Sequence, residues 1–131
     1  MLKRTLGMIP REVIVITDRQ GRLITQPGID LNKFANNIAE IREHIEAGRE
    51  LPPHFYRASP GRDYLLEDHG WLHLHVGHGI DDSVLLIIEP LEDRVIFIAL
   101  TDHGIFHERP RAKSLRGLGS KIAKARLPKS T

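Results

Sequence analysis

The most regular hydrophobic pattern in the chain lies between residues 71 and 106. Alternation at residues 71–78 predicts a strand with leucine and valine on its buried side and histidine on its open side. Residues 84–88 and 95–100 are apolar throughout and rich in β-branched side chains, so we expect them to be central strands. The segment Pro90–Asp93 between them predicts a hairpin turn. These three strands therefore predict a small sheet that is paired as a meander.

An amphipathic helix is predicted ahead of these strands. Asp30 is suited to cap its N-terminus and Gly48 to end it. Apolar residues recur between them at helical spacing, which predicts one helix face packed on the sheet. They are Leu31, Phe34, Ala35, Ile38, Ile41 and Ile45. Earlier in the chain, residues 12–16 predict a short strand, residues 18–21 a turn, and residues 22–25 the second arm of a hairpin.

Two further segments carry less regular patterns. Residues 50–70 contain three prolines and two glycines, so we expect an irregular connection, and a loop of that length in a small domain is often functional. Residues 112–127 predict a basic helix that Gly117 and Gly119 weaken. Together the elements predict a single α+β domain, with one or two helices packed on a small antiparallel sheet.

Within this domain we expect three parts. Residues 1–29 form an N-terminal strand or hairpin extension, residues 30–106 the core, and residues 107–131 a basic tail or helix. The chain of 131 residues holds no apolar run of about 18 residues, so we expect no membrane span, and none long enough for a signal peptide at its start. Cysteine is absent, which excludes disulfides and thiolate metal sites and fits the cytoplasm.

Charge is distributed unevenly along the chain, although the net charge is only +2. After Phe106 there are eight lysine or arginine residues and one acidic residue, whereas residues 1–106 carry 11 basic and 16 acidic residues. A basic segment on an acidic body predicts a polyanionic partner such as RNA, DNA or a ribosome. The alternative is a solvated terminus without any partner.

Residues with acid–base or metal-binding chemistry lie at the ends of the predicted strands. His73 and His75 fall on the open side of the first strand, and Asp81 and Asp82 follow it in the next connection. His103 comes directly after the last strand. A meander brings these strand ends together, so His75, either aspartate and His103 are expected to converge.

The histidines allow three interpretations. Two histidines can serve as base and acid at an RNA phosphodiester, with an arginine from the loop to steady the phosphate. A His-x-His pair with His78 and a carboxylate can instead hold zinc, iron or manganese. The third interpretation is that the histidines are simply exposed along an open strand face. Spacing alone leaves all three open.

A series of short motifs occurs in a fixed order over residues 33–106. They are Leu51-Pro52 with Tyr56-Arg57, then Leu74-His75-Val76, Asp82, Leu85 to Ile88, and His103 with Phe106. This order resembles the RelE/ParE superfamily, the toxins of bacterial type II toxin–antitoxin pairs, and especially its YafQ-like and YafO-like mRNA interferases. The Gly61-Arg62-Asp63 segment and the His73–His75 pair are more similar to the YafO-like branch.

The chain also departs from that pattern. Ser59 stands where YafQ-like toxins have a further loop histidine, and the ending from His103 to Phe106 is one residue short. Loop length makes Asp81 and Asp82 interchangeable in the alignment. The hairpin before the helix is not part of the superfamily pattern.

The resemblance implies a compact α+β, microbial-RNase-like fold and cleavage of mRNA, often on the ribosome, without a metal or other cofactor. The expected catalytic residues are His75, Asp82 and His103, and the expected substrate-binding residues are Phe106, Arg57, Arg62 and His73. A cytoplasmic toxin of this kind would have a cognate antitoxin, mRNA and the ribosome as partners, and no membrane. ParE-type members share the fold but inhibit gyrase, so a non-catalytic inhibitor or nucleic-acid-binding module remains an alternative.

Overall fold

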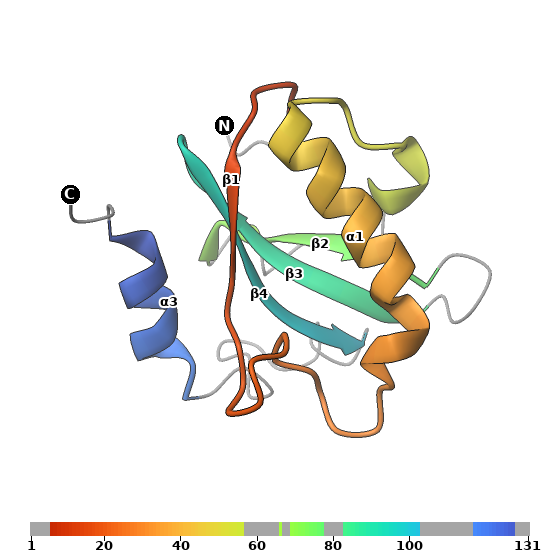
Figure 1. Ribbon diagram of the computed structural model, residues 1–131, viewed down its shortest axis with the longest axis vertical. Helices are drawn as coiled ribbons and strands as arrows, with labels where there is room; N and C mark the ends of the chain where they lie inside the picture. The colour runs from red at the N-terminus through yellow and green to blue at the C-terminus, as the bar shows by residue number, and fades with distance from the viewer. Residues whose placement is uncertain (1–5, 57–65, 67–68, 78–82, 103–116, 128–131) are drawn as a thin grey trace.

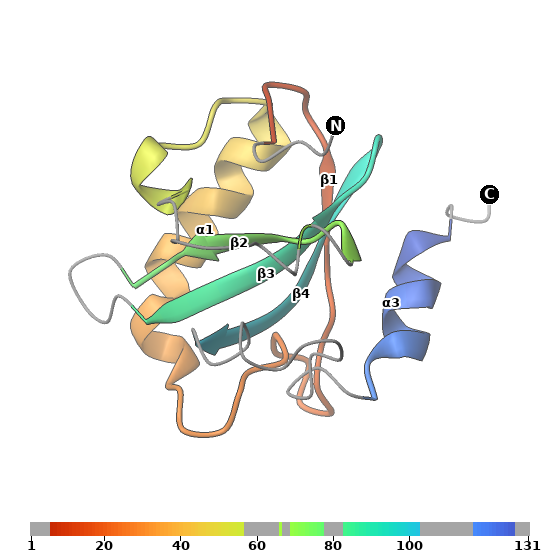
Figure 2. The same ribbon diagram turned by 180° about the vertical axis from the view of Figure 1, so that it is seen from behind.

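A computed structural model describes residues 6–56, 66, 69–77, 83–102 and 117–127. Their regular elements, in chain order, are strand β1 (Glu12–Val15), helix α1 (Leu31–Ala47), the short 3₁₀ helix η1 (Pro53–Tyr56), strands β2 (Leu72–His75), β3 (Val84–Pro90) and β4 (Arg94–Asp102), and helix α3 (Gly119–Arg126). Figure 1 shows α1 crossing one face of the sheet while α3 lies beside β1, and Figure 2 shows the same arrangement from behind. The predicted α+β class is confirmed.

The four strands form one sheet in the order β1-β4-β3-β2. Strands β2, β3 and β4 are antiparallel neighbours, which confirms the predicted meander. The prediction of an antiparallel sheet is wrong in one respect, because β1 pairs with β4 in parallel and the sheet is therefore mixed. The alternation of a four-residue strand is the same in either direction, so the sequence pattern of β1 carries no information about its orientation.

The predicted N-terminal hairpin is present as a tight turn between β1 and α1. Thr17 and Leu23 form an antiparallel bridge, and the Asp18 carboxylate accepts hydrogen bonds from the backbone of Gln20 (2.8 Å) and Arg22 (3.1 Å). Thr25 then bridges to Leu100 in parallel, so the chain returns to the side of β4 after the turn. The hairpin is thus joined to the same sheet as the three predicted central strands.

Helix α1 begins and ends where the sequence predicts. The Asp30 side chain accepts a hydrogen bond from the Asn32 backbone at 3.0 Å, which satisfies one of the free N–H groups of the first turn. Gly48 ends the helix at φ 70°, a left-handed conformation that favours glycine. Phe34, Ile41 and Ile45 are buried, whereas Ala35, expected on the same face, is exposed.

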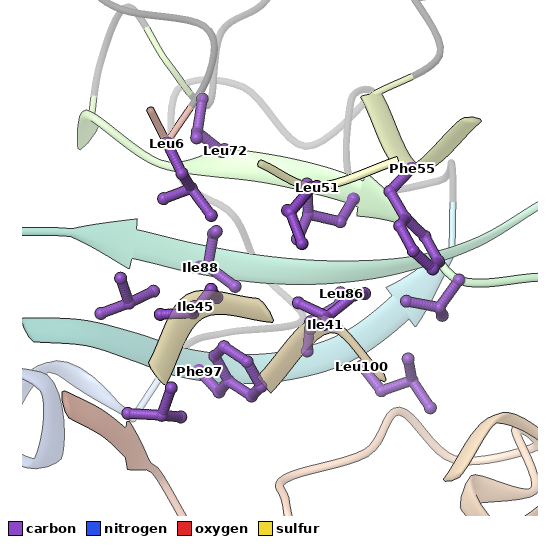
Figure 3. Packing of buried hydrophobic residues seen from close by; sticks show 14 of the residues in the cluster. Leu6, Ile41, Ile45, Leu51, Phe55, Leu72, Leu86, Ile88, Phe97 and Leu100 are labelled. Carbon is purple, nitrogen blue, oxygen red and sulfur yellow. The ribbon is translucent and has the colours of Figure 1, made fainter. Parts of the chain in front are cut away.

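Both faces of the sheet are apolar, and each carries its own cluster of buried side chains. The α1 face, defined as the face that α1 covers, includes residues from all four strands and from α1 and η1, and Figure 3 shows these side chains pointing toward one another. The α3 face is the opposite one. Its buried residues are Ile16, Trp71, Leu85, Ile87, Ile96, Ile98, Ala99 and, from α3, Ile122.

A β-bulge interrupts the pairing of β3 with β4. Ile87 is aligned with Ala99 while Ile88 is aligned with Phe97, so Ile98 is an extra residue on β4. Two adjacent residues, Ile98 and Ala99, therefore belong to the α3 face. Beyond the bulge the alternation resumes, with Leu100 on the α1 face.

Two predictions about the remaining segments need correction. The connection after α1 is not wholly irregular, because η1 forms there and buries Phe55 completely. The predicted basic helix begins only at Gly119 in the described part of the chain, and residues 112–116 lie outside it. Among the described residues, no helix combines the length and apolar character that crossing a membrane requires.

Gly48 and Gly28 offer a matched pair of substitutions for measuring the contact beneath the end of α1. Both glycines have positive φ, 70° and 94°, but a Cβ on Gly48 would lie 2.6 Å from the Pro10 Cδ, whereas one on Gly28 would meet nothing within 4 Å. We expect Gly28→Ala to lower the free energy of unfolding by about 1 kcal/mol from backbone strain alone. Gly48→Ala should cost roughly 1–3 kcal/mol more from overpacking. Urea unfolding measures both, and equal losses would contradict the proposed contact.

Tyr56 gives a prediction about alkaline pH. Its hydroxyl oxygen accepts a hydrogen bond from the Leu6 backbone at 3.0 Å, and partial burial raises the pKa of Tyr56 above its ordinary value of 10.0. Because the folded state favours the neutral phenol, this contribution to stability is complete below pH 10 and is lost as the pH rises through the folded-state pKa. Tyr56→Phe should cost about 1 kcal/mol at neutral pH and flatten the alkaline decline. Urea unfolding at several pH values checks this, and an unchanged alkaline slope would refute it.

Candidate functional site

The ends of β2 and β4 meet at one end of the sheet, on either side of the start of β3. His75, the last residue of β2, is aligned with Leu85, and Leu85 is aligned with Thr101 of β4. Aligned residues of neighbouring strands point to the same face, so His75 and Thr101 both belong to the α3 face, roughly 10 Å apart across one intervening strand. The structure thus brings together the two strand ends on which the predicted catalytic histidines depend.

His73 and His75 lie next to each other on the α3 face of β2. Their ring centroids are 5.4 Å apart and the rings are nearly perpendicular, at 68°. His75 is only 6% exposed, and His73 is half-buried. The interpretation of exposed histidines on an open strand face is therefore wrong for His75, because that face is a second apolar layer.

Most of the other predicted site residues lie outside the described part of the chain. These are Asp82 and its alternative Asp81, His103, Phe106, Arg57 and Arg62, together with Ser59 and His78. Their predicted roles stay predictions. Within the residues that the structure does describe, no group of three or more histidine, aspartate or glutamate side chains is arranged to hold a metal ion.

Gln26 contacts the end of β4 through both its backbone and its side chain. Its backbone N–H donates to the Leu100 carbonyl at 2.8 Å. Its side-chain oxygen accepts from the Thr101 hydroxyl at 2.6 Å, and its side-chain nitrogen donates to the Asp102 carboxylate at 2.8 Å. Nothing in the local sequence marks this role of Gln26, because Thr101 lies 75 residues further along the chain.

Asn37 makes the corresponding contact at the end of β2. Its side-chain nitrogen donates to the Val76 carbonyl at 2.6 Å, which ties the middle of α1 to the first residue after the strand. The same residue lies between the apolar positions that predict α1, so the sequence pattern offers no signal for this role.

A buried carboxylate joins α3 to the sheet. Glu89 of β3 is 5% exposed and accepts a hydrogen bond from the Trp71 indole at 2.9 Å. Arg126 of α3 donates two further hydrogen bonds to it, at 2.6 and 2.5 Å. These bonds raise the pKa of Arg126 above its usual value. The His69 ring in turn stacks on the Trp71 ring, with the two ring centroids 4.2 Å apart.

Two more polar contacts hold α3, and one of them is made by a residue of the basic segment that suggested a polyanionic partner. Lys121 donates to the Thr17 carbonyl at 2.9 Å, and the buried Arg94 of β4 donates to the Leu127 carbonyl at 2.5 Å. Of the three basic side chains in the described part of α3, Lys121 and Arg126 are thus bonded within the chain, and Lys124 is exposed. Part of the basic segment therefore has a structural role.

A surface hollow lies beside the N-terminus of α1. It is lined chiefly by polar residues of the hairpin and the loop that follows, among them Asp18, Arg22, Thr25, Gln26 and Asp30. The two predicted site residues that the structure describes, His73 and His75, do not line it. The Asp30 side chain already occupies the first-turn N–H of Asn32, so the helix end there is capped from within the chain.

Comparisons of the chain with known proteins add nothing to the fold and the strand-end geometry described above. A scan against protein-family models finds no match. Searches of curated proteins and of solved structures find no match either.

Arg126 should stabilise the fold mainly by pairing with the buried carboxylate. Arg126→Ala leaves the Glu89 charge buried with the Trp71 indole as its remaining donor among the described residues, so we expect a loss of about 3 kcal/mol. Lys124→Ala, on the exposed side of the same helix, should change stability by less than about 0.5 kcal/mol. Adding Glu89→Gln to Arg126→Ala should recover part of the loss, because the buried charge is then gone. Urea unfolding compares the three, and similar values for both single variants would rule out the pairing as a source of stability.

Proposed function

We propose that this chain is a toxin of a bacterial type II toxin–antitoxin system, of the RelE/ParE superfamily, and that it cleaves mRNA as an endoribonuclease. The proposal starts from the ordered motifs of residues 33–106 and their resemblance to YafQ-like and YafO-like mRNA interferases. The observed α+β fold, with a β2-β3-β4 meander and α1 across one face, is compatible with it.

One observation carries the proposal furthest. The register of the meander aligns His75 with Leu85 and Leu85 with Thr101, so the residue that precedes Asp102 and His103 in the chain shares a sheet end with His75. An acid and a base that act on one phosphodiester must both be within hydrogen-bond reach of it. Two strands that end at the same end of the sheet, as β2 and β4 do, can hold an acid and a base near one phosphodiester.

The proposed chemistry divides the roles among few side chains. One histidine of the pair His75 and His103 removes the proton from the ribose 2′-hydroxyl, whose oxygen then attacks the phosphorus. The other histidine protonates the leaving 5′-oxygen, so that the proton balance closes without a metal ion. Asp82 orients one of the histidines, and Arg57 or Arg62 neutralises charge on the phosphate. Phe106 stacks on a base and His73 contacts the substrate beside His75.

The partners follow from the same proposal. A cytoplasmic toxin of this class acts on mRNA at the ribosome and is held inactive by a cognate antitoxin. The exposed Lys124 and the basic residues outside the described part of the chain supply nonspecific attraction to RNA. This attraction weakens with added salt.

A second candidate is a non-catalytic inhibitor or binding module with the same fold. The burial of His75 favours it, because a side chain that is 6% exposed offers little surface to a substrate. The integration of Lys121 and Arg126 into the fold also reduces the charge available for RNA. In this candidate the target is a protein or nucleic acid that is bound without chemistry.

The first test is primer extension on a reporter mRNA in a reconstituted translation reaction, with protein treated with EDTA and re-equilibrated. We expect cuts that need translating ribosomes, and a loss of roughly 10²–10⁴-fold in cleavage rate for His75→Gln and for His103→Gln. The matched control is His44→Gln. His44 lies in the last turn of α1, where its Nδ1 contacts the Glu40 carbonyl.

Each outcome decides between the candidates. Cleavage that survives both histidine substitutions would overturn the assigned roles. Inhibited translation with intact transcripts would favour the binding module. Activity that is lost after EDTA and restored by a divalent metal would instead support the metal-dependent interpretation of the histidines. Thermal unfolding of each variant confirms that the comparison is made between folded proteins.

A further inference from the structure

Gln26 has an amide orientation that its two side-chain partners fix. The Asp102 carboxylate can only accept hydrogen bonds, so the nitrogen of the amide must face it at 2.8 Å. The oxygen then faces the Thr101 hydroxyl at 2.6 Å, and Thr101 is 1% exposed. With the backbone bond to Leu100, three consecutive residues at the end of β4 are held by one residue of the segment before α1.

Asn37 holds the end of β2 from the side of α1. It belongs to α1, whose buried residues cover the α1 face, and its amide nitrogen reaches the Val76 carbonyl at 2.6 Å. Val76 is completely buried, so a loss of this donor would leave the Val76 carbonyl unsatisfied, which costs free energy. The bond therefore fixes the backbone directly after His75, where the sheet pairing of β2 has ended.

We propose that Gln26 and Asn37 are positioning residues for the ribonuclease site, and that the N-terminal segment is an integral part of that site through Gln26. Gln26 holds the side chains of Thr101 and Asp102, which directly precede His103 in the chain, and Asn37 holds the backbone directly after His75. The inference rests on the proposed function, because positioning has a catalytic consequence only where those histidines react.

Position matters here because His75 is the last paired residue of β2, and His103 follows Asp102, the last residue of β4, in the chain. Within a strand, the ladder of hydrogen bonds on both sides sets the backbone, but His75 is at the last pair of β2, an edge strand. Acid–base groups must be held close to their productive geometry, and a misplacement of 1 Å can cost on the order of 10²-fold in rate. The two amides add to the restraint that the sheet gives at the last paired residues of β2 and β4.

The experiment replaces each amide by the carboxylate of the same shape. Asn37→Asp places a charge against the Val76 carbonyl, and its control Asn36→Asp adds the same charge on the neighbouring exposed residue. Gln26→Glu places a carboxylate against Asp102, and its control is Gln20→Glu in the exposed turn. The rescue is Gln26→Glu combined with Asp102→Asn, which exchanges donor and acceptor and restores the bond.

Three readouts are taken on the full chain. Cleavage kinetics should show kcat lowered on the order of 10²-fold in Asn37→Asp and Gln26→Glu, with KM and the rates of both controls unchanged. The double variant should regain most of the loss in kcat that Gln26→Glu causes. NMR of the protein without RNA should show altered imidazole resonances of His75 in Asn37→Asp, and faster amide exchange at Thr101 in Gln26→Glu.

The readouts separate this inference from the function on which it rests. If the wild-type protein cleaves RNA and both variants match their controls in kcat, the positioning roles are wrong while the ribonuclease proposal stands. If the wild-type protein does not cleave, the ribonuclease proposal fails. The His75 resonances and Thr101 exchange then still decide whether the amides fix the strand ends, and unchanged spectra would reject that too.

Discussion

Two strands, β3 and β4, are buried on both of their faces, and the rest of the molecule is arranged around that constraint. Leu85, Leu86, Ile87 and Ile88 are all inaccessible to solvent, and so are Ile96 and Ile98 on the neighbouring strand. A strand that is apolar on alternate residues needs one cover, whereas a strand that is apolar throughout needs two. The chain therefore needs a second layer of apolar side chains on the face that α1 does not cover.

The two covers differ greatly in size. Helix α1 has 17 residues and contributes several large side chains to its face, while the described helix α3 has eight residues and contributes one buried side chain, Ile122. So little apolar area cannot hold a helix by itself. The polar contacts made by Arg126, Arg94 and Lys121 supply the remaining attachment, at the cost of burying the Glu89 charge. The weaker cover is thus fixed by geometry-specific bonds rather than by area.

What the sequence predicted correctly depends on neighbours along the chain, and what it missed depends on distant ones. The cap at Asp30, the end at Gly48 and the hairpin after Pro90 are set by residues within a few positions, so local chemistry sufficed. The direction of β1, the burial of His75 and the partner of Glu89 depend on segments that meet only after folding. Arg126, for instance, is 37 residues from Glu89. The superfamily resemblance and the catalytic roles drawn from it are still predictions.

The bulge at Ile98 has a consequence for how this chain can vary in length. Because one extra residue sits opposite Ile87, Thr101 points to the His75 face and Asp102 to the α1 face. Removing Ile98 would restore regular pairing and leave those two faces as they are, because Ala99 would follow Phe97 on the opposite face and Thr101 would stay aligned with Leu85. A one-residue deletion at the bulge should therefore keep the end of β4 in place, and its cost is the loss of the buried Ile98 side chain from the α3 face.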